Sequence, residues 1–461
     1  MPQRSGPNRQ LAVLIEEAGY SHKGLAARVV ALGRARGYPG LKYNHSSVQR
    51  WLRGECPRAP AADLLAEVFS GAVGRPVTRA DLELPAGSPP ADGALIMPQD
   101  PAGAADVISN LARDDLEHRR PLTTSDFSLH AYSSAALRWL VAPRTALYPG
   151  RGGRRVGSAD VQEIREAIAA FRVLDNRLGG GRIRPAVVDY LCADIAPLLD
   201  EARCTDPVRR ELFSAAAELA HLCGWQAHDL ELQGLAQRYL VQALALARLA
   251  ADEALGGEIL AAMSQQALYL AQATQAVDMA QVAAATGSRA GLPMLQAESL
   301  LMQAHGHALL GDASACSRAL RQAETTFSRP TSDPPPWLAY FDEAYFAAKI
   351  GHCFRALGQG VQLEQYALRS LDMNPRFIRG KAFNTVLLAA GYALQGELAQ
   401  ACSYGKDAVD LASSLDSARA VAYIRDLLRI LTPRQHEPVV SEFTHYARSA
   451  LPALQPHASR R

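Results

Sequence analysis

Three stretches in the second half of the chain repeat one pattern, in which a glycine and a polar residue separate two segments with helical spacing of apolar residues. The turns fall at Gly311-Asp312, Gly358-Gln359 and Gly396-Glu397, so their spacings are 47 and 38 residues. One such helix pair cannot bury its apolar faces alone, and successive pairs therefore stack into a superhelix with a concave inner wall. The pattern restricts this half of the chain to an all-α helical-repeat fold.

The preceding residues extend the repeat towards the N-terminus. Helix pairs are predicted over 206–251, with a turn near Trp225–Asp229, and over 256–287, with a turn near Thr274. Abundant alanine and an aromatic content of only 7% favour packed helices over sheets. We expect the repeat domain to cover 104–450, interrupted by irregular stretches at 143–157 and 328–336, with a tail at 451–461.

The first 84 residues predict a separate small helical domain. Four helices are expected, at 8–19 with Asn8 as N-cap, at 21–37 with Ser21 as N-cap, at 46–53, and at about 61–71. Proline, glycine and alanine dominate residues 85–103, where no helical or strand period survives. This composition is typical of a flexible linker between two domains.

The distribution of charge also distinguishes the N-terminal part of the chain from the rest. Residues 1–58 contain ten lysines and arginines against three glutamates, whereas the remainder of the chain is mildly acidic. A compact basic segment on an acidic body is the charge distribution expected of a nucleic-acid-binding protein. A solvated basic surface without a nucleic-acid partner is the alternative interpretation.

A motif in this basic segment supports DNA binding. The pattern S-x-x-x-L-A followed by S-S-V-Q-R-W-L-R-G-E resembles the helix-turn-helix of the Xre/Cro phage-repressor family, and the matching residues are Ser21, Leu25, Ala26, Val48, Trp51, Leu52 and Gly54. The resemblance implies a lambda-repressor-like domain whose third helix enters the major groove of DNA. Val48 and Trp51, three residues apart, are expected to pack that helix onto the second one. About ten residues separate Arg36 from Ser46, which is longer than the family's usual joint.

The resemblance also assigns roles to individual residues. The start of the third helix would contact base edges through His45, Ser46, Ser47, Gln49 and Arg50. Arg50 is the best single candidate, because a guanidinium binds guanine O6 and N7 with two hydrogen bonds. Contacts to DNA phosphates are expected from Ser21, His22, Lys23, Lys42, Asn44 and Arg53.

A DNA-binding head followed by degenerate tetratricopeptide-like repeats resembles cytoplasmic regulators of actinobacteria and firmicutes. Gly358, Ala367 and Pro375 match the repeat consensus best. The resemblance implies a transcriptional regulator, expected to be a repressor of differentiation or secondary metabolism, that binds double-stranded DNA as a homodimer. It also implies a peptide, small molecule or protein effector in the repeat groove.

Polar and aromatic residues on the first helix of each pair are the candidates for that groove. Asn384 is suited to a peptide backbone, and Lys349, Arg379 or Lys381 to a carboxylate. Buried packing for the aromatic residues and a solvated face for the cations remain open as alternatives. The predicted groove residues are Gln265, Tyr269, Met302, His305, Tyr345, Lys349, Arg379, Lys381 and Asn384.

Other functional classes have little support in the sequence. The chain lacks the Walker A, nucleophile-elbow and zincin motifs, so no enzyme activity and no cofactor are expected. Seven scattered cysteines form no C-x-x-C pair, and no local set of three ligands predicts a metal site. The N-terminus does not resemble a signal peptide, so a cytoplasmic, nucleoid-associated protein is expected. The alternative function is a non-enzymatic adaptor, in which the repeats bind a protein partner and the head is a docking bundle.

Overall fold

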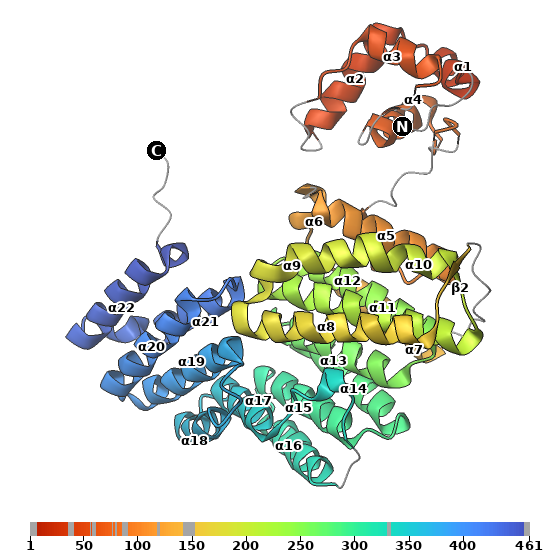
Figure 1. Cartoon of the computed structure of the whole chain (residues 1–461). Coiled ribbons are helices and arrows are strands. Elements are labelled where there is room, and N and C mark those ends of the chain that lie inside the picture. The colour runs from red at the N-terminus through yellow and green to blue at the C-terminus, as the bar shows by residue number, and fades with distance from the viewer. Residues whose placement is uncertain are drawn as a thin grey trace. The chain divides into compact units, whose positions relative to one another are not determined.

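The computed structural model of the chain describes residues 7–35, 41–55, 57, 61–75, 77–78, 81–84, 91–117, 120–141, 153–329 and 333–455. The chain divides into two compact units, Met1–Asp92 and Gly93–Arg461, which we call the head and the body. Both are built from helices (Figure 1). The described strands are the two-residue segments β1 (Arg154–Arg155) and β2 (Ala202–Arg203), which pair in parallel. The predicted all-α fold class is confirmed.

The head contains four helices: α1 (Arg9–Glu17), α2 (His22–Ala35), α3 (His45–Leu52) and α4 (Ala61–Val73). Asn8 caps α1 by accepting a hydrogen bond from the Leu11 N–H at 2.9 Å, and the Ser21 hydroxyl accepts from the Gly24 N–H at 3.1 Å at the start of α2. Both predicted caps are therefore present. The expected end of the second helix at Gly37 lies outside the described residues.

A single apolar core joins the four helices of the head. Leu25 and Val29 of α2 meet Val48 and Trp51 of α3, and all four side chains are buried. Tyr43, just before α3, packs edge-on against Trp51 with 5.2 Å between ring centroids. This packing fixes one face of α3 and leaves the opposite face exposed.

Six consecutive helix pairs form the repeat part of the body, and neighbouring helices pack along the whole series (Figure 1). The first helices of the pairs are α11 (Asp206–Asp229), α13 (Glu253–Tyr269), α15 (Pro293–Leu309), α17 (Glu343–Ala356), α19 (Ile378–Gln395) and α21 (Ala418–Leu431). The second helices are α12 (Gln233–Ala250), α14 (Ala273–Arg289), α16 (Ala313–Phe327), α18 (Gly360–Ser370), α20 (Leu398–Ser413) and α22 (Pro438–Ala450). Consecutive helices of the repeats pack in the manner of a superhelix, as the glycine turns predicted.

The turns between these helices use a left-handed backbone conformation at regular intervals. The five residues with positive φ between α11 and α16 lie twenty residues apart, at Glu231, Ala251, Ala271, Gly291 and Gly311. Gly358 and Gly396 occupy the same position in the later pairs. The turns predicted near Trp225–Asp229 and Thr274 lie in the structure at 230–232 and 270–272, because the helices end later and begin earlier than the sequence suggested.

The first part of the body packs on both sides of the early repeats. It comprises the 3-10 turn η1 (Ala91–Leu95), α5 (Pro101–Leu116), α6 (Arg120–Thr123), α7 (Leu129–Val141), α8 (Ser158–Leu178), α9 (Gly180–Asp189), the π-helical turn η2 (Tyr190–Ile195) and α10 (Ala196–Glu201). Helices α5 and α7 contact α12, whereas α8 and α9 contact α11, and α8 also reaches α19.

The predicted linker is shorter than the sequence indicated. Residues 85–90 lie outside the described residues, but Ala94 and Met97 are buried in the core of the body. Asp100 accepts from the Gly103 N–H at 2.9 Å and caps α5, which Pro101 begins. Residues 93–103 are therefore part of the body, because two buried side chains and a helix cap hold this proline-rich stretch.

The remaining short elements are the 3-10 turns η3 (Pro336–Leu338), η4 (Thr432–Arg434) and η5 (Pro452–Leu454). The predicted irregular stretch at 328–336 ends in η3, where Trp337 and Leu338 are buried. In the part of the chain that the structure describes, we find no helix with the length and apolar character needed to cross a membrane.

Candidate nucleic-acid interface and inner wall

The exposed face of α3 carries most of the residues predicted to contact DNA. His45, Ser46, Gln49, Arg50 and Arg53 are all exposed, and their spacing places them on one side of the helix. The described residues of this face include two arginines, a histidine and neutral donors but no carboxylate. Such a short, donor-rich helix face matches the hydrogen-bonding pattern of major-groove base edges.

Two of the predicted contacts have a structural role at the start of α3. Asn44 is the N-cap of α3. Its Oδ1 accepts a hydrogen bond from the Ser47 N–H at 3.1 Å, and the Ser47 hydroxyl accepts one from the Asn44 N–H at 3.4 Å. Ser47 is 4% exposed, so the prediction that it contacts base edges is wrong. The reciprocal cap consumes its hydrogen-bonding capacity within the head.

Among the described residues of the head, Arg50 forms an ion pair with Glu55. Its Nη1 lies 3.6 Å from Glu55 Oε1, and both side chains are more than half exposed. An exposed ion pair of this length contributes little to stability and leaves the guanidinium able to turn towards a ligand. Of the residues predicted to contact phosphate, Ser21, Lys23, Lys42, Asn44 and Arg53 are exposed and His22 is half-buried.

The first helices of the repeat pairs meet through two groups of ring contacts, which together we call the inner wall. His228 of α11 packs edge-on against Tyr269 of α13, with 5.1 Å between centroids. His305 of α15 stacks on His352 of α17 at 5.6 Å, and His352 lies edge-on to Tyr423 of α21 at 5.9 Å. Of the predicted groove residues, Tyr269 thus contacts His228, and His305 contacts His352.

These rings lie in a poorly hydrated environment although most of them are only half-buried. Tyr269, His305, His352 and Tyr423 keep part of their surface exposed. Desolvation nevertheless lowers the pKa of His305 to about 3, with nearby cationic charges adding to the effect, and it lowers the pKa of His352 well below its ordinary value. Partial exposure combined with strong desolvation indicates side chains surrounded by protein on most sides.

A buried carboxyl pair lies next to this wall. The Tyr340 hydroxyl is 2.8 Å from Glu258 Oε1 and 2.9 Å from Glu298 Oε1, and the Tyr345 hydroxyl is 3.0 Å from Glu298 Oε1. Burial raises the pKa of both carboxyls, and the charge of Glu298 raises that of Glu258 further. Two neighbouring buried carboxyls resist double ionisation, so the pair retains a proton. Sequence reasoning missed both glutamates because a lone Glu in a helix is usually a surface residue.

Lys349 of α17 joins the cluster formed by Glu258, Glu298, Tyr340 and Tyr345. Its Nζ lies 2.5 Å from Gln265 Oε1, and it sits 4.8 Å from the centre of the Tyr345 ring. Burial lowers the pKa of Lys349 to about 8, although the charge of Glu298 opposes the shift. Three predicted groove residues, Gln265, Tyr345 and Lys349, are thus brought together.

The other predicted groove residues do not join this cluster. Met302 is 1% exposed and packs against α13 and α14, so it does not line the groove. Asn384 donates to the Ser370 carbonyl at 2.8 Å and ties α19 to α18, which leaves its amide unavailable for a peptide backbone. Arg379 is buried in ion pairs with Asp175 and Asp229, and Lys381 is exposed on α19.

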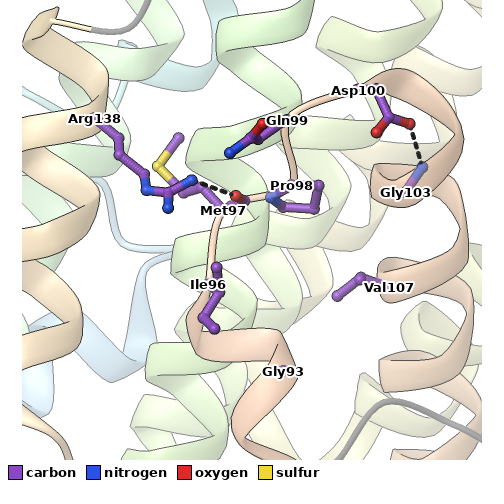
Figure 2. A pocket seen from close by; sticks show the side chains of 9 residues that line it. All are labelled: Gly93, Ile96, Met97, Pro98, Gln99, Asp100, Gly103, Val107 and Arg138. Carbon is purple, nitrogen blue, oxygen red and sulfur yellow. Dashed lines mark hydrogen bonds between the residues drawn. The ribbon is translucent and has the colours of Figure 1, made fainter.

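A hollow of about 420 Å³ lies where the predicted linker enters α5 (Figure 2). Arg138 of α7 crosses its wall and donates to the Met97 carbonyl at 3.2 Å, and Asp100 is engaged in capping α5. Arg138 and Asp100, the charged side chains that line the hollow, therefore already form hydrogen bonds within the body. We also find no group of three His, Cys, Asp or Glu side chains arranged for a metal ion among the described residues.

Comparison with known proteins gives one family match. The model of a family described as SP15 N-terminal domain matches residues 11–85, which lie within the head. A search among curated proteins found no match to the chain.

Proposed function

We propose that the protein is a sequence-specific DNA-binding regulator of transcription in which α3 contacts base edges in the major groove. The observation that carries the proposal is the exposed face of α3, held in place by the buried Val48 and Trp51 on its opposite side. The excess of basic residues in the first 58 positions supports it, because phosphate attraction supplies most non-specific affinity. The resemblance of Ser21, Leu25 and Ala26 to the Xre/Cro pattern also supports it.

The proposal includes a homodimer and an effector. One short helix contacts few base pairs, so a pair of heads on a two-fold operator would supply the missing specificity. The inner wall is the proposed effector site, because its half-buried rings and its cations offer stacking and charge to a bound molecule. We further propose that the protein represses differentiation or secondary metabolism, and this part of the proposal is supported by the family resemblance alone.

The decisive test is an Arg50→Ala variant. A duplex site is first selected from random DNA with the full-length protein, and affinities are then measured on this site and on an unrelated duplex. We expect a loss of about 1–3 kcal/mol on the selected site with relaxed preference at one base position, because a bidentate guanine contact is removed. Light scattering on the complex gives the number of chains bound.

Arg75→Ala is the matched control. Arg75 is also a head arginine in an exposed ion pair, 3.1 Å from Glu17, but it lies outside α3. Its removal is expected to weaken binding to all duplexes equally and only slightly. If Arg50→Ala reduces affinity for both duplexes by the same factor, Arg50 does not read bases. Failure of the protein to enrich any duplex sequence would refute the proposed function.

A further inference from the structure

Helical-repeat arrays normally make contacts only between neighbouring repeats. Lys349 of α17 bonds Gln265 of α13, and His352 of α17 meets Tyr423 of α21, so contacts in the body already skip one pair. The body departs further from this rule where the end of α8 and the end of α11 contact α19 and the start of α21. The residues joined there are 150 to 238 positions apart in the sequence, from Asp229–Arg379 to Leu178–Asp416. This contact joins the first repeat pair to the last two pairs. Stacking of neighbouring repeats does not by itself produce such a contact.

Asp229, the last residue of α11, is the centre of this contact. Its Oδ2 accepts from the Gly180 N–H at 2.9 Å and from Arg379 Nη1 at 3.2 Å. Its Oδ1 accepts from the Ser417 hydroxyl at 3.0 Å and lies 3.3 Å from Arg419 Nε. Asp229 is fully buried, and these partners hold its pKa below the ordinary value although burial opposes them.

Arg379 completes the ionic part of the contact. Its Nη2 donates to Asp175 Oδ2 of α8 at 2.6 Å while its Nη1 donates to Asp229. Arg419 lies over two rings that pack on the inner wall. It is 4.9 Å from the centre of Trp225, which contacts His228, and 4.7 Å from that of Phe383, which contacts Tyr423. Side chains from α8, α11, α19 and α21 therefore meet at one point.

The run Gly179-Gly180-Gly181 permits the backbones to approach. The Gly181 N–H donates to the Asp416 carbonyl at 2.9 Å, and the Asp416 N–H donates to the Leu178 carbonyl at 3.0 Å. A Cβ at Gly179, whose φ is +87°, would lie 2.6 Å from the Asp416 carbonyl oxygen. A Cβ at Gly181 would lie 2.4 Å from the Asp416 carboxylate. A side chain at Gly179 would therefore push the two backbones apart, whereas the atoms nearest a Cβ at Gly181 belong to the exposed Asp416 carboxylate, which can turn aside.

Two apolar cores lie on the two sides of this contact. One core runs from Ala94 to Cys353 and a second from Leu363 to Leu451, and they share no fully buried residue, although the half-buried Phe354 packs against both. The contact between residues 175–181 and the later repeats consists of hydrogen bonds, ion pairs and guanidinium–ring stacking. Ion pairs that are buried when closed and hydrated when open change little in free energy, because desolvation offsets their attraction. Such a contact can open without unfolding either core.

We propose that this contact, which we call the latch (residues 175–181 and Asp229 against Arg379 and residues 416–419), opens and closes as a unit in the folded protein. Opening withdraws Arg419 from Trp225 and exposes this end of the inner wall. The latch thereby controls access to the inner wall. Its role in effector sensing rests on the proposed function, but its opening does not require the head to bind DNA.

Hydrogen exchange on the full-length protein without DNA tests the proposal. The amides of Gly181 and Asp416 report the latch, and the amides of Leu388 and Ala408 report the second core. We expect the latch amides to exchange at least tenfold faster than the core amides in the unmodified protein. This difference measures opening without global unfolding.

Three variants separate the latch from general destabilisation. Gly179→Ala places a Cβ 2.6 Å from the Asp416 carbonyl oxygen and is expected to accelerate exchange at Asp416 at least tenfold, while Leu388 and Ala408 are unchanged. Gly181→Ala is expected to accelerate it less, because the exposed Asp416 carboxylate can turn away from the added Cβ. Gly153→Ala is the control, since its Cβ would meet nothing within 4 Å.

Two results would overturn the proposal. In the first, the latch and core amides of the unmodified protein exchange at the same rate, which means that the latch opens only when the body unfolds. In the second, Asp416 exchange in Gly179→Ala equals that in Gly153→Ala. Neither result bears on selection of a DNA site by the head, so the two proposals fail independently.

Discussion

Ser46 and Ser47 are neighbours in the sequence but have different environments. Ser46 is exposed beside His45, whereas Ser47 is buried and exchanges hydrogen bonds with Asn44. Both serines were predicted to contact base edges, because the sequence places both in the first turn of one helix. The reciprocal cap distinguishes them, and it requires knowing at which residue the helix begins.

Buried histidines of α11 predict how the stability of the body changes with pH. Desolvation lowers the pKa of His221 and His228 to about 3, and no partner for either ring nitrogen of His221 is found among the described residues. Below pH 6.5 the unfolded chain binds protons that the folded body does not bind until about pH 3. Each histidine therefore lowers the unfolding free energy by roughly 1.4 kcal/mol per pH unit as the pH falls through this window.

Urea unfolding of the unmodified protein and of His221→Gln between pH 7.5 and 5.5 checks this prediction. The variant is expected to lose less stability over this range, because one proton-linked group is absent. Comparing the two proteins cancels the contribution of Glu258 and Glu298, whose raised pKa values act in the opposite direction. Equal slopes in both proteins would show that folding does not lower the pKa of His221.

At the scale of helices, the sequence identified turns only where glycine marks them. Gly311, Gly358 and Gly396 were found, but the equivalent positions 231 and 251 carry Glu and Ala. These turns keep the left-handed conformation because the packing of the flanking helices requires a short reversal there. The left-handed conformation costs about 1–2 kcal/mol for a residue with a Cβ, and the packing of the flanking helices offsets this cost. The amino-acid composition therefore does not reveal these turns.

Ala271→Gly is expected to stabilise the body by about 0.5–1 kcal/mol. Ala271 is exposed with φ of +56°, so glycine relieves its strain without losing buried surface, and the greater freedom of the unfolded chain offsets only part of the gain. Thermal and urea unfolding measure the change. Ala290→Gly is the matched control, because Ala290 ends α14 with φ of −73° and glycine there is expected to destabilise. The strain argument is wrong if both substitutions destabilise equally.

For the whole molecule, separate cores predict separate unfolding. The core of the head runs from Leu11 to Leu84 and shares no buried residue with the cores of the body. Cooperative unfolding follows shared buried contacts, so the head and the body are expected to unfold in distinct transitions.

Leu65→Ala in the head and Leu387→Ala in the body test this expectation by calorimetry. Both side chains are fully buried, so each substitution is expected to cost about 2–5 kcal/mol in its own core. Leu65→Ala should lower the temperature of one transition and Leu387→Ala that of the other. A single transition that both substitutions shift would show that head and body unfold as one unit.

Periodicity, caps and glycine turns were sufficient to predict the all-α class, the four head helices and the stacked pairs of the body. Each of these depends on residues within one or two helical turns of one another, which a sequence displays directly. The limits of the linker, the burial of Ser47 and Met302, and the Glu258–Glu298 pair depended on tertiary packing. The contact of the first repeat pair with the last two pairs at Asp229 depended on tertiary packing most clearly. Its partners come from segments up to about two hundred residues away, and no local pattern records which distant helix will satisfy a buried charge.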